Sequence, residues 1–131
     1  ADNRPVVPPD EPLGPESVLG LQFPVPGAYL SRFLPLLGTC RVRSLGSSAL
    51  LAAYAALGVL AGSADFRLKV WDLAAAAALV AGAGRETRFF GKSPFPLEEF
   101  HPDLPSCPYY AGSAAFLQKV GELLDGPGPD A

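Results

Sequence analysis

Histidine is almost absent from this sequence, in which His101 is the only one among 131 residues. A metal site built from several histidines is therefore excluded, and any Ser-His catalytic arrangement would depend on that single residue. Cysteine is nearly as scarce, and Cys40 and Cys107 stand far apart without metal-type spacing. Two cysteines make a thin disulfide framework, so we expect both to be buried thiols of a cytosolic protein.

Charge is also scarce, because charged residues make up only 18% of the chain and the formal net charge is −3. The ten lysines and arginines are scattered, whereas a nucleic-acid-binding surface needs a basic patch. The N-terminal stretch ADNRPVVPPDEP is polar and rich in proline, unlike a signal peptide. We therefore expect a cytoplasmic protein that binds no nucleic acid.

One long charge-free stretch, from Leu45 to Ala64, is long enough to span a bilayer. Alanine, glycine and serine make up most of it, and only six of its residues are strongly apolar. Each of those favours membrane insertion by roughly 0.3 to 0.6 kcal/mol, which scarcely offsets the polar residues. We interpret the stretch as a helix buried inside a layered protein and expect no membrane contact, with a membrane span as the alternative.

Apolar residues nevertheless make up 49% of the chain, which is enough for the core of one domain. Their periodicity, together with the prolines and glycines, predicts strands at 17–23, 40–46, 66–70, 86–90 and 109–113, and helices at 27–37, 47–62, 72–80 and 116–124. This alternation predicts an α/β layered sandwich, a mixed sheet with helices on its faces. We assign 17–125 to the domain, 1–16 to an irregular proline-rich lead-in and 126–131 to a frayed tail.

Ligands of α/β sandwiches gather where strands lead into helices, because helix N-termini offer unpaired N–H groups. One such place is the turn Gly46-Ser47-Ser48, whose small residues leave the backbone accessible to a hydroxyl-rich or anionic ligand. A simpler explanation is that Ser47 or Ser48 is a helix N-cap, a contribution of about 1 kcal/mol. On spacing alone, the N-cap is favoured.

The second place is Trp71-Asp72, where Asp72 admits two interpretations. As an N-cap, its carboxylate would accept N–H bonds from the first helical turn and be favoured by the helix dipole. As a metal ligand, it would offer a hard oxygen to Mg²⁺, which often takes only one or two protein carboxylates. Asp65, seven residues earlier, could point to the same place across the predicted strand.

The two places together resemble the C-terminal half of the inositol monophosphatase family, the lithium-sensitive, Mg²⁺-dependent phosphatases. The stretches that carry the resemblance are RSLGSSALLAAYAALGVLAG and DFRLKVWDLAAAAALV. The family has a similar R-S-x-G-[ST]-A-A-L stretch with an alanine-rich helix, and then an acidic residue seven positions before an Asp that follows Trp. The beginning and the end of the chain also look like the segments that flank this half of the family.

The resemblance implies a role for five residues. Asp72 falls on a metal-binding aspartate, and Asp65 falls on an acidic residue that contacts a substrate hydroxyl. Gly46, Ser47 and Ser48 fall on the turn whose backbone lies against the substrate. Arg67 stands where the family usually has glycine, which leaves open an inositol phosphate or a more anionic substrate, such as a sugar bisphosphate or a nucleotide bisphosphate.

Family catalysis also needs a glutamate and a D-P-[LI]-D-[GS]-T motif from the N-terminal half, and this sequence contains neither at the required order and spacing. The resemblance therefore implies the C-terminal part of a Mg²⁺-dependent phosphomonoesterase that acts on inositol phosphate or a related sugar or nucleotide phosphate and is inactive alone. Its expected protein partner is the missing N-terminal half or a second copy. The alternative is a non-catalytic structural or interaction module.

Overall fold

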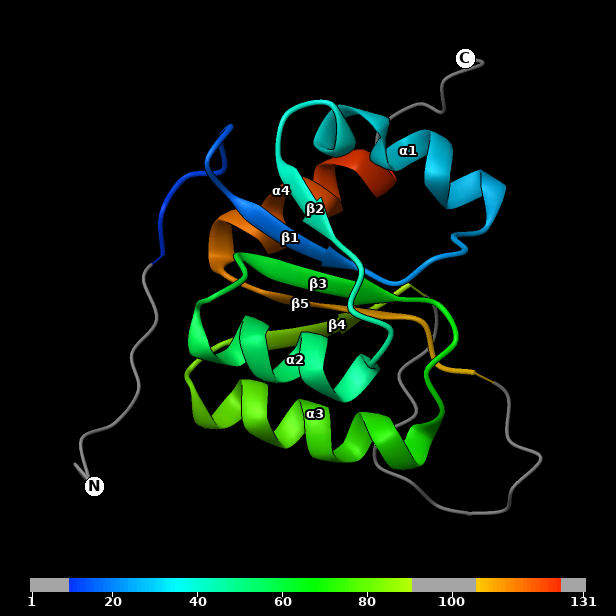
Figure 1. Cartoon of the computed structure of the whole chain (residues 1–131), viewed down its shortest axis with the longest axis vertical. Helices are drawn as coiled ribbons and strands as arrows, with labels where there is room; N and C mark the ends of the chain where they lie inside the picture. Colours follow the sequence, from blue (N-terminus) through cyan, green and yellow to red (C-terminus); the bar gives the residue numbers. More distant parts are fainter. Residues whose placement is uncertain (1–9, 91–105, 126–131) are drawn as a thin grey trace.

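The computed structural model describes residues 10–90 and 106–125, which form one sheet and four helices (Figure 1). In chain order these are β1 (Val18–Leu21), α1 (Gly27–Leu37), β2 (Arg41–Arg43), α2 (Ser48–Leu57), β3 (Gly62–Asp65), α3 (Val70–Gly82), β4 (Glu86–Phe89), β5 (Tyr109–Gly112) and α4 (Ala114–Asp125). His101 lies outside the described residues.

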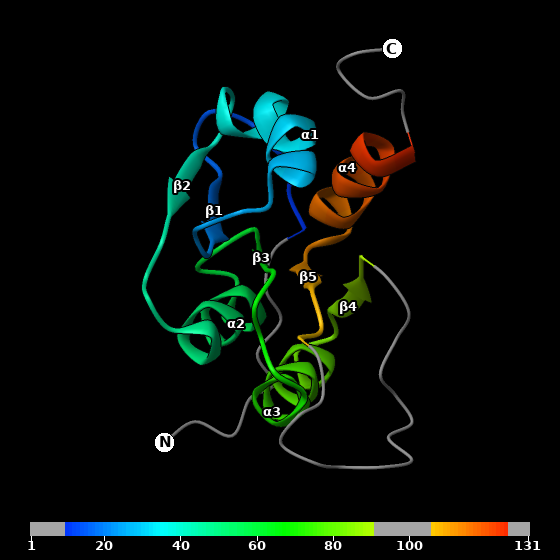
Figure 2. The ribbon, with the colours of Figure 1, turned by 90° about the vertical axis from the view of Figure 1, so that its right-hand side faces the viewer.

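The sheet is mixed and has the strand order β2-β1-β3-β5-β4. β1 runs parallel to both β2 and β3, whereas β5 runs antiparallel to β3 and β4. Helices α1 and α4 cover one face of the sheet, and α2 and α3 lie side by side on the other (Figure 2). The predicted α/β layered sandwich is therefore confirmed.

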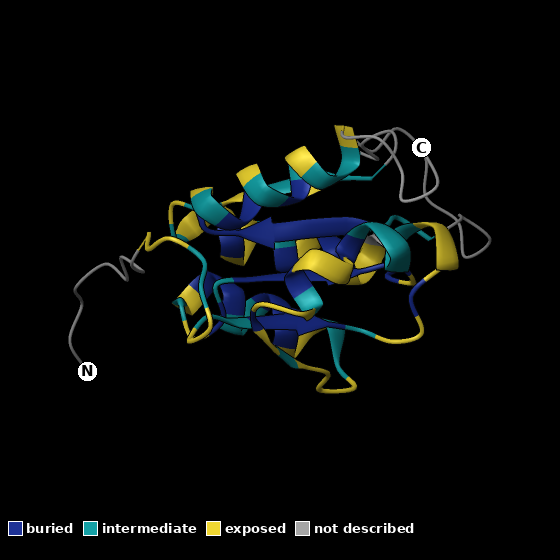
Figure 3. Cartoon of the chain, turned by 90° about the horizontal axis from the view of Figure 1, so that it is seen from above, coloured by how far each residue is buried: buried dark blue, intermediate teal, exposed yellow. Residues whose placement is uncertain are grey.

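The sheet separates two apolar cores, and the buried residues follow its three central strands β1, β3 and β5 (Figure 3). The core under α1 and α4 includes Leu19, Phe33 and Phe116. The core under α2 and α3 includes Leu73 and Val80 of α3, with Tyr109 and Ala111 of β5. Because consecutive strand residues point to opposite faces, the same strands serve both cores.

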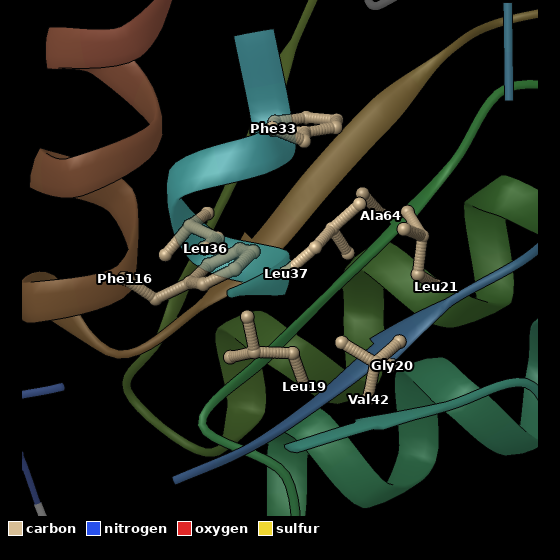
Figure 4. Close-up of a pocket in the computed structure, with 9 residues that line it drawn as sticks. All are labelled: Leu19, Gly20, Leu21, Phe33, Leu36, Leu37, Val42, Ala64 and Phe116. Carbon is tan, nitrogen blue, oxygen red and sulfur yellow. The ribbon is translucent and has the colours of Figure 1, made fainter. Parts of the chain in front are cut away.

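A small cavity lies between the sheet and α1, and its lining is entirely apolar (Figure 4). It measures about 20 Å³, close to the minimum that a water molecule needs, and it offers no polar partner to hold one. We therefore regard this cavity as a packing gap within the core.

The charge-free stretch from Leu45 to Ala64 is not one long helix, and the predicted helix end at Gly62 is wrong. Helix α2 ends at Leu57, because Gly58 has a left-handed φ of 82° and its N–H bonds back to Ala55. Among the described residues, no helix is both long and apolar enough to cross a membrane.

The strand that follows α2 is also displaced from its prediction. The sequence alternation predicts a strand at 66–70, but β3 is the preceding segment Gly62–Asp65. Phe66 and Leu68 do point to opposite cores, which accounts for the alternation, yet they form no ladder.

Gly62 is required because a Cβ there would lie 2.2 Å from the Phe116 ring.

We expect Gly62→Ala to lower the free energy of unfolding by about 1 to 3 kcal/mol, because the added methyl overpacks the contact with Phe116. The control is Gly82→Ala, where a Cβ meets no atom within 4 Å in the last residue of α3, and stability should stay level or rise by up to about 1 kcal/mol. Urea denaturation measures both. Equal stability of the two variants would contradict the close contact at Gly62.

Candidate functional site

The parallel strands and the helices that follow them place the predicted site residues at one edge of the sandwich. β1 and β3 end at this edge, and α2 and α3 begin there (Figure 1). Asp65 is the last residue of β3, Ser48 is the first residue of α2, and Asp72 lies in the first turn of α3. The fold therefore gathers at one edge residues that are dispersed in sequence.

Asp65 is buried, with only 1% of its surface exposed. Its Oδ2 accepts a hydrogen bond from the Ser48 hydroxyl, and its Oδ1 accepts one from the Arg67 backbone N–H at 2.8 Å. A buried carboxylate is stable only with such donors. Asp65 consequently ties the end of β3 to the beginning of α2 and to the segment that leads to α3.

Tyr109 is the neighbour of Asp65 across the β3–β5 ladder and is fully buried. Burial raises the pKa of Tyr109 to about 12, the nearby Ser63 hydroxyl opposes the rise, and the negative charge of Asp65 adds to it. Within the described residues, neither the Tyr109 nor the Ser63 hydroxyl reaches a partner in hydrogen-bonding geometry. No local sequence pattern indicates this neighbourhood, because it depends on the register between two strands far apart in the chain.

Ser47 is the N-cap of α2, which confirms the prediction that Ser47 or Ser48 caps this helix. Its backbone is extended, and its Oγ accepts a hydrogen bond from the Leu50 N–H at 3.2 Å. The preceding Gly46 has a left-handed φ of 71°, a conformation that favours glycine. Both serine hydroxyls are thus engaged within the chain, and contact between this turn and a substrate stays a prediction.

Asp72 is not a helix cap, so that interpretation is wrong. Helix α3 begins at Val70, Lys69 occupies the N-cap position, and Asp72 is the third helical residue. The Asp72 backbone N–H already bonds to the Lys69 carbonyl at 3.1 Å. Asp72 is exposed, and within the described part of the chain its carboxylate has no hydrogen bond or ion pair.

The free carboxylate of Asp72 suits a hard cation, whereas the rest of a metal site is not visible. The dipole of α3 favours a negative charge in the first turn of the helix, and this effect does not require a hydrogen bond to the Asp72 carboxylate. Within residues 10–90 and 106–125, no group of three or more His, Cys, Asp or Glu side chains could hold a metal ion. Since Mg²⁺ often takes one or two protein carboxylates with water and phosphate, Asp72 fits as one ligand and cannot form the site alone.

The two cysteines are thiols without a disulfide. Cys40 is buried as predicted, whereas the prediction that Cys107 is buried is wrong, because its side chain is partly exposed. The Cys107 backbone N–H bonds to the Leu68 carbonyl at 2.8 Å, in the segment that leads to α3. Burial raises the pKa of the Cys40 thiol, which keeps it protonated and unreactive.

Comparisons with known proteins identify the family. The model of the inositol monophosphatase family matches residues 24–122. Inositol-1-monophosphatase ImpA of Mycolicibacterium smegmatis is 37% identical over a 93-residue alignment that covers 64% of this chain and 34% of that protein. The chain therefore spans about a third of the length of that curated relative.

Solved structures share the fold. The extragenic suppressor protein SuhB of Bartonella henselae superposes with a TM-score of 0.74 at 23% identity, over 95% of this chain and 47% of that one. An inositol monophosphatase from Anabaena superposes with a TM-score of 0.72 at 21% identity, over 98% and 51% of the two chains. The chain thus corresponds to about half of each solved relative.

We expect the Ser48–Asp65 bond to appear as a coupling in a double-mutant cycle. Asp65→Ala leaves two donors unpaired and should lower the free energy of unfolding by about 1 to 3 kcal/mol, whereas Asp72→Ala, at an exposed site, should cost less than about 1 kcal/mol. Combining Ser48→Ala with Asp65→Ala should show a coupling of about 0.5 to 3 kcal/mol. Strictly additive effects in urea denaturation would mean that the bond contributes nothing.

We expect Tyr109→Phe to change the alkaline limb of the stability profile. Because the folded pKa of about 12 lies above the ordinary value of 10, the wild type is fully stabilised below pH 10 and loses stability as the pH rises toward 12. The phenylalanine variant lacks this loss, and near neutral pH it removes only a hydroxyl without a partner. Chemical denaturation across alkaline pH measures the difference, and parallel profiles for both proteins would refute the raised pKa.

Proposed function

This chain belongs to the inositol monophosphatase family, and we propose that it contributes the C-terminal part of a Mg²⁺-dependent phosphomonoesterase that is incomplete without an N-terminal half. The observation that carries the proposal is the Asp72 carboxylate, which is exposed in the first turn of α3 and has no hydrogen-bond or ion-pair partner within residues 10–90 and 106–125. The helix dipole alone favours a carboxylate at this position, and the family match supports its role as a metal ligand. The family match and the span of about half of each solved relative support the same assignment.

In this proposal, Asp72 is the one metal ligand that this chain supplies. When bound, Mg²⁺ polarises a phosphoryl oxygen and lowers the pKa of a bound water. The remaining ligands would come from the glutamate and the D-P-[LI]-D-[GS]-T motif that the resemblance assigns to the N-terminal half. The chain alone is therefore expected to be inactive with Mg²⁺ and a phosphomonoester.

The substrate would lie at the same edge, against Gly46, Ser47 and Ser48. For Asp65 to contact a substrate hydroxyl, its buried carboxylate would have to become accessible, and the Ser48 hydroxyl is the donor whose side chain can rotate away. The Arg67 side chain is exposed two residues beyond Asp65. Its positive charge supports a phosphorylated small molecule more anionic than an inositol monophosphate, such as a sugar or nucleotide bisphosphate.

We expect Asp72→Asn to separate metal binding from folding. The test fuses the N-terminal half of Mycolicibacterium smegmatis ImpA to this chain and assays phosphate release. The variant should keep its melting temperature within the small change expected from the helix dipole but lose about a hundredfold or more of its activity, with weaker Mg²⁺ dependence. Asp125→Asn, at the exposed end of α4, is the matched control and should keep full activity.

Two outcomes would count against this proposal. If Asp72→Asn is as active as the wild-type fusion, then Asp72 is no metal ligand. If the folded wild-type fusion shows no Mg²⁺-dependent turnover of any phosphomonoester, the chain is the alternative, a non-catalytic structural or interaction module.

A further inference from the structure

Ser48 is the partly exposed partner of a buried carboxylate. It is the first residue of α2, at the edge where the site residues gather, whereas Asp65 is only 1% exposed. The Ser48 hydroxyl donates to Asp65 Oδ2, and the Arg67 backbone N–H donates to Asp65 Oδ1 at 2.8 Å. A molecule bound at this edge therefore meets the Ser48 side chain before it meets Asp65.

The bond to Asp65 fixes the direction of the Ser48 proton. A serine hydroxyl has one proton and two lone pairs, whereas a carboxylate only accepts hydrogen bonds. Turning the proton away would leave a buried carboxylate oxygen without its donor, which is costly. The Ser48 oxygen can consequently only accept a hydrogen bond from a group on its outer side.

The other buried hydroxyls beside Asp65 do not replace Ser48. Tyr109 lies opposite Asp65 in the β3–β5 ladder, and Ser63 lies two residues before Asp65, on the same face of β3. Within the described residues, neither hydroxyl has a partner in hydrogen-bonding geometry. Ser48 is therefore the hydroxyl that engages this carboxylate.

We propose that the Ser48 oxygen, whose proton is held by Asp65, accepts a hydrogen bond from a free hydroxyl of the substrate. Asp65 is then a positioning residue that acts through Ser48, in place of a direct contact with the substrate. This inference rests on the proposed function and deepens it, because it names a group that the substrate must present. It is particular to this chain, since the motif R-S-x-G-[ST]-A-A-L has alanine where Ser48 stands.

The same polarity excludes a phosphate group at this position. An unprotonated phosphate oxygen brings only lone pairs toward the Ser48 oxygen, and the negative charge of Asp65 lies behind it. A hydroxyl provides the missing proton. The substrate is therefore a phosphorylated polyol or sugar with a free hydroxyl at Ser48, and any second phosphate lies elsewhere, toward the exposed Arg67 side chain.

The test measures KM and kcat of the fusion with the N-terminal half of Mycolicibacterium smegmatis ImpA for two substrates that share one ring size. Inositol monophosphate carries free hydroxyls, and cyclohexyl phosphate carries none. Ser48→Ala should raise KM for inositol monophosphate by about threefold to tenfold, the worth of one hydrogen bond, with kcat nearly unchanged. KM for cyclohexyl phosphate should not change, which also shows that the site is still folded. Ser48→Thr, which keeps the hydroxyl, should keep both wild-type KM values.

Ser31→Ala is the matched control and should change neither KM. The Ser31 hydroxyl is likewise hydrogen-bonded, to the Gly27 carbonyl at 3.1 Å, but it lies on α1, on the opposite face of the sheet. A direct contact between Asp65 and the substrate predicts the opposite sign for Ser48→Ala, because loss of the competing hydroxyl would free Asp65 Oδ2 and lower KM for inositol monophosphate. A lowered or unchanged KM, or an equal rise for both substrates, would overturn the proposal.

A second measurement adds Asp65→Asn to the Ser48→Ala fusion. Because Asp65 acts through Ser48, KM for inositol monophosphate should not rise further, and a further rise would assign the substrate hydroxyl to Asp65 itself and overturn the proposal. A fusion without turnover refutes the proposed function, and calorimetric dissociation constants of the same two ligands then decide this inference. Tighter binding of inositol monophosphate than of cyclohexyl phosphate, lost in Ser48→Ala, would uphold it. Any other result, including no binding, would overturn it.

Discussion

Asp65 places a carboxylate inside a three-layer sandwich, where an anion is stable only when it is hydrogen-bonded. Its two donors come from different segments, the Ser48 side chain at the beginning of α2 and the Arg67 backbone beyond β3. The positions of α2 and of the segment leading to α3 therefore depend on one buried group. Ser47 caps α2 at the same edge, and Asp72 is exposed in the first turn of α3.

The helices on the two faces of the sheet differ in the side chains on their outer sides. The outer side of α4 carries exposed polar residues, whereas the outer sides of α2 and α3 are mainly apolar. Leu57 on α2 and Leu79 on α3 are about half exposed, so this layer presents apolar side chains on its outer side. Asp72, the one charged residue of the two helices, lies at the edge where they begin.

Much of this fold could be predicted from the sequence, because hydrophobic period and proline or glycine position are local signals. The errors arose where local signals compete. Helix α2 is ended by Gly58 and not by Gly62. The two glycines look alike in the sequence, and only the left-handed backbone of Gly58 in the folded chain distinguishes them. Aspartate is a common N-cap residue, which favoured Asp72 as the cap, but α3 begins two residues before it, at Val70. The bond between Ser48 and Asp65 joins residues 17 positions apart through the sheet, so no local pattern could predict it.

The central claim is that Asp65 organises this edge and Asp72 meets the metal. The most direct measurement is a crystal structure of the chain fused to a family N-terminal half, grown with Mn²⁺ in place of Mg²⁺ so that anomalous scattering locates the ion. The account predicts an Asp72 carboxylate oxygen at about 2.1 Å from the ion, with Asp65 still accepting from the Arg67 N–H. A metal ion bound to Asp65, or an Asp72 side chain turned away from every metal position, would contradict it.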